Sequence, residues 1–266
     1  MTEALYTDRL TRRFGELTVV DSLNLSIEDG EVFGLLGRNG AGKSTLIKML
    51  TTLLPATSGI ARVGGFDIAR QANEVRRLIG YVPQALSADG ELTGYENLKV
   101  FGQLYDIPRS LREQRIREGL EFMGLADAAG KLVGTYSGGM IRRLEIAQSM
   151  LHRPKVLFLD EPTVGLDPVA REAVWAHLKQ LRSSYGMTIF LTTHYMDEAE
   201  QLCSRLGILR RGRLVAQGTL SEISASSGLG NVGLDPLFAH YTEDGSESEG
   251  GYGEAAKTRS TSQRLG

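Results

Sequence analysis

The sequence has little of what marks secreted, membrane-spanning or nucleic-acid-binding proteins. It holds 1 cysteine among 266 residues, Cys203, so no internal disulfide can form and a reducing cytoplasm is the natural setting. No apolar run reaches the roughly 18 residues of a spanning helix, so a membrane function would need another chain. The formal net charge of -2 gives no electrostatic case for nucleic acid as a general partner. These observations together favour a globular cytoplasmic protein.

The pattern along the chain predicts an α/β fold. Hydrophobic residues make up 41% of the sequence, which is ample for a buried core. Over residues 1–80 short β-like runs alternate with turns, and over 96–124 apolar residues recur at helical spacing. Strand-like runs at 156–159 and 188–192 flank a helical stretch, which indicates parallel strands joined by a right-handed crossover.

The composition changes after residue 223. Ser, Gly and Glu dominate residues 224–233 and 242–253, which is typical of chain without fixed structure, and only Asp235–Phe238 suggests a short element. We therefore expect one domain over residues 1–223, with a helical subdomain at about 85–150, and a short flexible tail over 224–266.

The segment Gly37–Ser44 carries the clearest chemistry. It fits G-x-x-x-x-G-K-[ST], follows an apolar strand at 32–36 and opens a predicted helix. Its glycines let backbone N–H groups face phosphate oxygens, while Lys43 would reach the β and γ phosphates and the Ser44 hydroxyl would hold Mg²⁺. This context disfavours a purely structural glycine turn. The predicted nucleotide contacts are Gly37, Arg38, Asn39, Gly40, Ala41, Gly42, Lys43, Ser44 and Thr45.

A second strand, Val156–Leu159, delivers two adjacent carboxylates. Asp160 and Glu161 follow it at the carboxyl end, where ligands bind in parallel α/β sheets. We predict that Asp160 holds Mg²⁺, directly or through water, and that Glu161 acts as the general base on the attacking water. Alone, such a strand end is more often structural, but the phosphate loop reverses that preference.

Three further polar residues stand at the ends of predicted elements. Gln84 follows the strand 79–82 and could contact both Mg²⁺ and the water, or be an ordinary loop glutamine. His194 ends the strand 188–193 and could bind the γ-phosphate, with a structural role as the alternative. Asp167 could contact the nucleotide, cap the helix that follows it, or do both.

The turn Ser137-Gly138-Gly139 leads into a helical pattern. A helix start with open N–H groups attracts phosphate, so the chain has two phosphate-binding helix starts for one nucleotide.

In this order, the segments resemble the nucleotide-binding subunits of ATP-binding cassette (ABC) transporters over roughly residues 5–223. The resemblance identifies the Walker A loop (37–45), Q-loop Gln84, signature (137–140), Walker B strand (156–161), D-loop (164–167) and switch His194. It implies ATP and Mg²⁺ as cofactors and a P-loop NTPase core of mainly parallel sheet with flanking helices. An N-terminal antiparallel β subdomain and an inserted helical subdomain complete the expected fold. Phe14 matches the aromatic that stacks on adenine, with a core position as the alternative.

The resemblance also accounts for the second phosphate site. In the family two cassettes face head to tail, and the signature of one closes over the ATP held by the Walker A loop of the other. It therefore implies a second ABC subunit, as a homodimer or with a homologue. It further implies a separate transmembrane permease and a place at the cytoplasmic face of the membrane, with no nucleic acid expected.

Within the family, the segments 136–140, 157–168 and 192–200 look most like the daunorubicin-resistance export ATPases, which implies ATP hydrolysis coupled to drug or antibiotic efflux. Tyr136 and Met140 stand where Leu and Gln are commonest, and Ile141 and Gln148 where relatives often carry Arg. Export of lipid, polysaccharide or ion stays open. So do a non-transport cassette ATPase acting on nucleic acid or ribosomes, and a small-molecule kinase, which would leave the Ser-Gly-Gly turn and His194 without roles.

Overall fold

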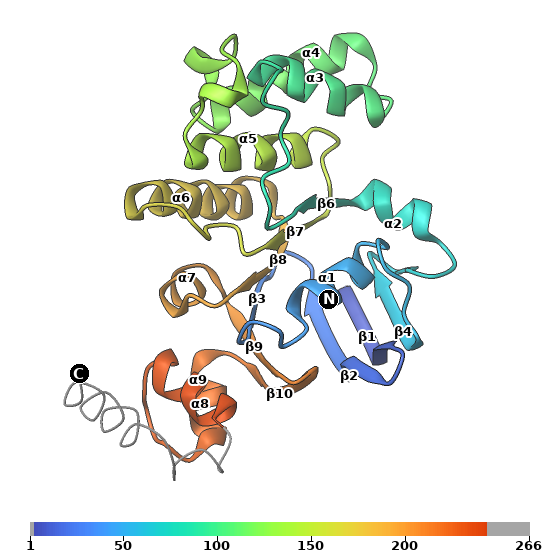
Figure 1. Cartoon of the computed structure of the whole chain (residues 1–266), viewed down its shortest axis with the longest axis vertical. Helices are drawn as coiled ribbons and strands as arrows, with labels where there is room; N and C mark the ends of the chain where they lie inside the picture. The colour runs from blue at the N-terminus through green and yellow to red at the C-terminus, as the bar shows by residue number, and fades with distance from the viewer. Residues whose placement is uncertain (1–2, 244–266) are drawn as a thin grey trace, which may run out of the picture.

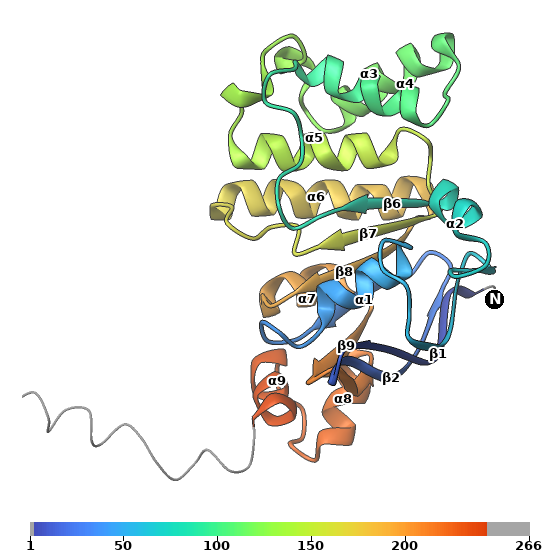
Figure 2. The same ribbon diagram turned by 45° about the vertical axis from the view of Figure 1, so that its right-hand side comes forward.

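Two β-sheets enclose helix α1 (Lys43–Leu50) in the computed structural model of the chain, which describes residues 3–243 (Figures 1 and 2). The first sheet is antiparallel and has the order β2-β1-β4-β5. Its strands are β1 (Glu3–Phe14), β2 (Leu17–Glu28), β4 (Ser58–Val63) and β5 (Phe66–Asp67). The expected N-terminal antiparallel subdomain is therefore present.

The second sheet has the order β10-β9-β3-β8-β7-β6 and is parallel apart from the β9–β10 hairpin. Its strands are β3 (Val32–Leu36), β6 (Ile79–Val82), β7 (Val156–Asp160), β8 (Thr188–Thr193), β9 (Arg205–Arg210) and β10 (Arg213–Gly218). Every residue of β3, β7 and β8 is buried, because both faces of the sheet are covered. The register pairs Leu36 with Thr193 and Asp160 with Thr192, so the carboxyl ends of these strands meet at one edge.

Helices are stacked on one face of this sheet. In Figures 1 and 2, α6 (Pro168–Tyr185), α5 (Gly138–Met150) and the pair α3 (Gly94–Leu104) and α4 (Arg109–Phe122) follow one another outward from the strands. The single-turn 3₁₀ segments 126–128 and 133–135 join α4 to α5. Helix α2 (Ala72–Leu78) precedes β6, and α7 (Met196–Leu202) follows β8. The middle of the chain is therefore a helical insertion, as its periodicity predicts.

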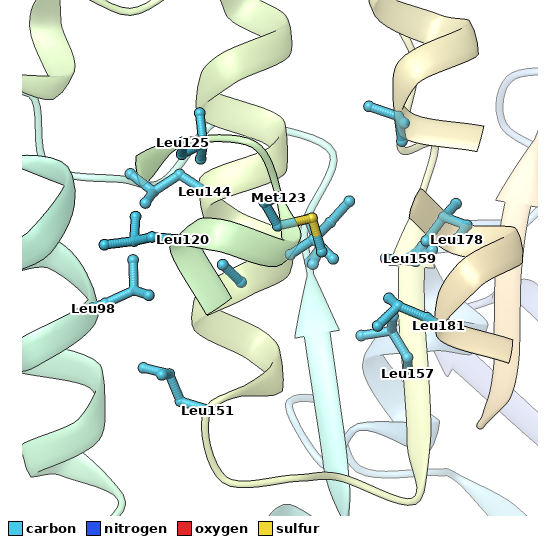
Figure 3. Packing of buried hydrophobic residues seen from close by; sticks show 14 of the residues in the cluster. Leu98, Leu120, Met123, Leu125, Leu144, Leu151, Leu157, Leu159, Leu178 and Leu181 are labelled. Atoms are coloured by element: carbon cyan, nitrogen blue, oxygen red, sulfur yellow. The ribbon is translucent and has the colours of Figure 1, made fainter. Parts of the chain in front are cut away.

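One hydrophobic core joins this insertion to the sheet. Figure 3 shows Leu157 and Leu159 of β7 facing Leu178 and Leu181 of α6, with Leu144 of α5 in the same cluster. The alternate β7 residues, such as Phe158, point to the opposite face and belong to the core around α1. Because β7 is packed on both sides, the carboxylates at its end have a rigid base.

The C-terminal part differs from the prediction of a tail without fixed structure after residue 223. Helices α8 (Leu220–Ser227) and α9 (Leu234–Thr242) are present, and Leu234 and Leu237 are fully buried in a cluster with Ala199 of α7 and Leu36 of β3. The short element suggested at Asp235–Phe238 is part of α9, whose buried leucines at helical spacing lie between stretches rich in Ser and Gly. The remainder of the predicted tail, 244–266, lies outside the described residues.

The fold class is confirmed: a mainly parallel sheet carries flanking helices, an antiparallel β subdomain and a helical insertion. None of the helices within residues 3–243 combines the length and the apolar character that crossing a bilayer requires.

Candidate nucleotide site

The loop between β3 and α1 is shaped to receive phosphate. Gly40 and Gly42 adopt left-handed φ angles of +81° and +109°, and a Cβ on Gly42 would lie 2.6 Å from the Val19 carbonyl oxygen. Glycine is therefore required at Gly42 by both conformation and space. A cavity of about 320 Å³ opens here, and its lining residues are Val19, Asn39, Gly40, Ala41, Gly42, Lys43, Ser44, Thr45, Gln84 and Glu161.

Lys43 and Glu161 form a buried ion pair at this cavity. The Lys43 ammonium lies 3.1 Å from Glu161 Oε1 and donates to the Gly37 carbonyl at 2.7 Å. On its other oxygen, Glu161 contacts His194 Nδ1 at 3.0 Å and accepts from the Gln84 amide at 3.5 Å. Glu161 also has a left-handed φ of +50°, a conformation that a non-glycine residue adopts at a cost and that is concentrated at functional sites.

Asp160 lies beside Glu161 and faces Ser44. Its Oδ1 accepts from the Ser44 hydroxyl at 3.1 Å and from the Thr192 hydroxyl at 2.6 Å, and the residue is buried. On the neighbouring strand, burial raises the pKa of Tyr81 to about 12, and the Asp160 charge adds to this. Thr192 was not among the predicted site residues. A hydroxyl two positions before His194, directly after the apolar run 189–191 of the strand, is the signal that could have found it.

The residues present fit a magnesium ion. The Ser44 hydroxyl and the Asp160 carboxylate supply neighbouring oxygen donors, the ligand type that Mg²⁺ prefers. Within residues 3–243 no group of three or more His, Cys, Asp or Glu side chains is arranged to hold a metal. Mg²⁺ is usually bound through one or two carboxylates together with substrate phosphates, so this small donor set suits it.

The Ser-Gly-Gly turn lies apart from this cavity, because none of its residues lines it. Ser137 caps α5, its hydroxyl accepting from the Met140 backbone N–H at 3.3 Å, and both Ser137 and Gly138 are exposed. A Cβ on Gly139 would lie 2.7 Å from the Ala170 Cβ. The turn therefore forms an exposed helix start packed against the beginning of α6.

Asp167 caps α6, since its carboxylate accepts from the Ala170 backbone N–H at 3.0 Å. This is the structural role that the sequence left open beside a nucleotide contact.

Phe14 is at the end of β1 and does not line the cavity. Its side chain is 45% exposed, which excludes the alternative of a core phenylalanine. The Arg12 guanidinium lies over the ring, 4.4 Å from its centroid. The structure thus brings together the loop 37–45, Gln84, Asp160, Glu161 and His194, and leaves Phe14, Ser137–Gly139 and Asp167 outside that group.

Comparisons with known proteins agree with this geometry. The family model described as "ABC transporter" matches residues 20–164. The linearmycin resistance ATP-binding protein LnrL of Bacillus subtilis is 40% identical over 224 residues, covering 84% of this chain and 72% of that protein. The daunorubicin/doxorubicin resistance ATP-binding protein DrrA of Streptomyces peucetius is 45% identical over 227 residues, covering 85% and 68%. The Nod factor export ATP-binding protein I of Paraburkholderia xenovorans is 43% identical over 234 residues, covering 88% and 75%.

Solved structures give the same answer. One described as the structure of the ATP binding subunit of an ABC transporter aligns with a TM-score of 0.81 at 30% identity, covering 90% of this chain and 100% of that one. A nucleotide-free ATP-binding cassette aligns with a TM-score of 0.75 at 26% identity, covering 82% and 92%. With the loop 37–45, an acidic strand end and His194 gathered at one sheet edge, and with these matches, the chain belongs to the ABC transporter family and is an ATP-hydrolysing cassette.

Proposed function

We propose that this chain is the ATPase subunit of an export complex, closing head to tail with a second cassette on two Mg-ATP and driving a separate permease. The observation that carries the proposal is the Ser137–Gly139 turn, whose Ser137 and Gly138 are exposed and which lies outside the cavity lined by the loop 39–45. A helix start of this kind binds phosphate well, yet it is not part of its own chain's nucleotide cavity. A second copy, related by a two-fold axis, would bring such a turn to each cavity.

In this proposal each chain supplies most of one hydrolytic site. Backbone N–H groups of the loop and Lys43 bind the β and γ phosphates, and Ser44 and Asp160 hold Mg²⁺, with Gln84 nearby. When bound, Mg²⁺ neutralises charge that develops on the phosphate oxygens. Glu161 takes a proton from the attacking water, and His194, 3.0 Å from it, orients that carboxylate and reaches the γ-phosphate.

Apolar residues on the surface of the helical insertion support a permease partner. Leu86, Val100, Leu104 and Tyr105 are exposed by between 38% and 72%, all within the segment that links β6 to α4. Exposed apolar residues gathered in one segment are typical of a protein–protein contact. We infer that this segment docks on the permease and that the chain is thereby held at the cytoplasmic face of the membrane.

The relatives suggest the class of cargo. Two of them are named for resistance to linearmycin or daunorubicin/doxorubicin, and a third for Nod factor export. We propose efflux of an antibiotic or drug, with export of a lipid, polysaccharide or ion as the alternative.

The dimer can be tested with a hydrolysis-deficient variant. Glu161→Gln should bind Mg-ATP without turning it over and should elute at twice the monomer mass in size-exclusion chromatography with light scattering. Adding Ser137→Arg should return it to monomer while leaving ATP binding in place, because the arginine obstructs only the partner's site. A Glu161→Gln protein that stays monomeric at saturating Mg-ATP would refute the head-to-tail arrangement.

A further inference from the structure

Helix α5 turns a polar face toward the segment 83–93, which runs from the end of β6 past α5 to α3 (Figures 1 and 2). Arg142, Glu145 and Gln148 recur at three-residue spacing on α5, and each is at most 3% exposed. Buried charged and amide side chains are costly unless they are hydrogen-bonded. The hydrogen-bond partners of these three side chains therefore indicate the role of this face of α5.

Arg142 and Glu145 hold the first half of the segment by its main chain. Arg142 donates from Nη1 to the Pro83 carbonyl at 2.6 Å and from Nη2 to the Gln84 carbonyl at 2.7 Å. Glu145 Oε1 accepts from the backbone N–H groups of Ser87 and Ala88 and from the Ser87 hydroxyl. The two side chains also pair with each other, Nη1 to Oε2, at 3.0 Å.

Gln148 continues this series toward α3. Its amide donates to Asn97 Oδ1 at 3.3 Å, and the Asn97 amide donates in turn to the Asp89 carbonyl at 2.9 Å and the Thr93 carbonyl at 3.1 Å. The second half of the segment is therefore held through Asn97. Side chains of α5 therefore hold the main chain of the segment 83–93, its first half directly and its second half through Asn97.

Residues 84–88 have little else to fix them. The side chains of residues 84–87 are exposed, and within residues 3–243 no backbone–backbone hydrogen bond outside the regular helices and strands involves residues 84–88. Yet Gln84 must lie beside Glu161, to which its amide donates at 3.5 Å. Its position is thus set by the pair on α5, the helix that begins at the Ser137–Gly139 turn.

We propose that Arg142 and Glu145 are positioning residues for ATP hydrolysis: they place Gln84 at the cavity and tie its position to that of α5. This rests on the proposed role of Gln84 at the hydrolytic site. Neither residue lines the cavity, so both act through the loop. Any shift of α5, such as one driven by contact of its exposed N-terminus with a second cassette, would carry Gln84 with it.

The test must separate positioning from mere stability. Removing one member of the pair leaves a buried charge without its partner, and such a variant can fail to fold. The double variant Arg142→Met with Glu145→Leu avoids this, because replacing a buried pair by apolar residues of similar volume is often neutral or stabilising. It keeps apolar packing on α5 and deletes every hydrogen bond that α5 makes to residues 83–88. Arg115→Met serves as the control, since Arg115 donates to the Leu151 carbonyl at the other end of α5.

With the full chain and Mg-ATP, the double variant should melt at or above the wild-type temperature. Its kcat should fall about 10- to 100-fold, as expected when a group at the reacting centre is misplaced by about 1 Å. KM for ATP should stay within about twofold, because the phosphate loop is untouched. Arg115→Met should match the wild type in both constants. A purely structural pair would leave kcat unchanged in a double variant that melts normally.

A second measurement tests the route through Gln84. In a Gln84→Ala background, the double substitution should add little further loss, since groups that act as one unit are not additive. If the losses multiply, the pair does not act through Gln84 and the inference is wrong. If Gln84→Ala is defective and the double variant has wild-type kcat, the inference fails alone. If Gln84→Ala itself has wild-type turnover, the proposed role of Gln84 fails and the inference with it.

Discussion

Replacing Glu161 by Gln changes one atom in the group that contacts Lys43, His194 and Gln84. The amide keeps the shape of the carboxylate and can still accept a hydrogen bond, but it carries no charge and cannot take a proton from water. The Lys43 ammonium keeps the Gly37 carbonyl at 2.7 Å and loses its ionic partner at 3.1 Å. The variant therefore separates the electrostatic role of Glu161 from its space-filling role.

The size of the effect follows from the burial of the pair. The Lys43 and Glu161 side chains are 5% and 7% exposed, so solvent screens them little. Neutralising one partner of a buried ion pair costs about 3–5 kcal/mol. For a chain of this size, that lowers Tm by about 6–20 °C. Mg-ATP brings phosphate charge to the same ammonium, so the nucleotide should raise the Tm of the variant by more than it raises that of the wild type. Loss of the general base should reduce kcat about 10²- to 10⁴-fold.

Thermal unfolding with and without Mg-ATP, together with steady-state phosphate release, measures both quantities. Glu172→Gln, an exposed position on α6, is the matched control and should change neither. Turnover of Glu161→Gln within twofold of wild type would refute the assignment of the base. A loss of Tm that Mg-ATP does not reverse would refute the reasoning about Lys43.

Other consequences can be tested separately. Phe14→Ala should raise KM for ATP about 5- to 100-fold by removing one base-stacking contact, and Phe14→Tyr should preserve it; an unchanged KM in Phe14→Ala would exclude adenine stacking. Ser44→Ala should raise the Mg²⁺ concentration needed for half-maximal turnover, and a Mg²⁺ dependence equal to wild type would contradict Ser44 as a ligand. Burial raises the pKa of the Glu198 carboxyl, so the folded state binds more protons than the unfolded state and wild-type stability falls as pH rises through the folded pKa. Glu198→Gln should therefore raise Tm over wild type at pH 8, and this gain should vanish toward pH 4. A gain independent of pH would contradict a raised pKa of the Glu198 carboxyl in the folded state.

The sequence predicts those parts of the site that depend on local pattern. The loop 37–44 needs glycine where φ is positive and where backbone must approach backbone, so its spacing is visible in one segment. Asp160, Glu161 and His194 end apolar strands, and parallel pairing brings such ends together whichever strands intervene. The structure places all of them at one edge, as the strand order requires.

The contacts that α5 makes with the segment 83–93 could not be predicted from the sequence. Arg142 and Glu145 at i and i+3 match the pattern of a solvent-exposed ion pair, and only the path of the distant segment 83–93 shows that they are buried. The extent of helix α9 was missed in a similar way, since the sequence suggests only a short element at Asp235–Phe238, while Leu234 and Leu237 find their core on the distant β3 and α7. In both cases packing against residues far away in the sequence determines which side chains are buried, and local composition does not reveal that packing.

The grip of α5 on the segment 83–93 has an evolutionary consequence. Arg142, Glu145 and Asn97 bond mostly to main-chain atoms there, which are the same whatever the side chains are. An exposed side chain such as that of Leu86 therefore makes none of the hydrogen bonds that hold the loop. In the proposed complex, mutations at such positions would change which permease surface this segment recognises and would leave Gln84 beside Glu161. The contacts that select the partner and those that place Gln84 would then involve different atoms of the same few residues, so a lineage could acquire a new permease without rebuilding its ATP site.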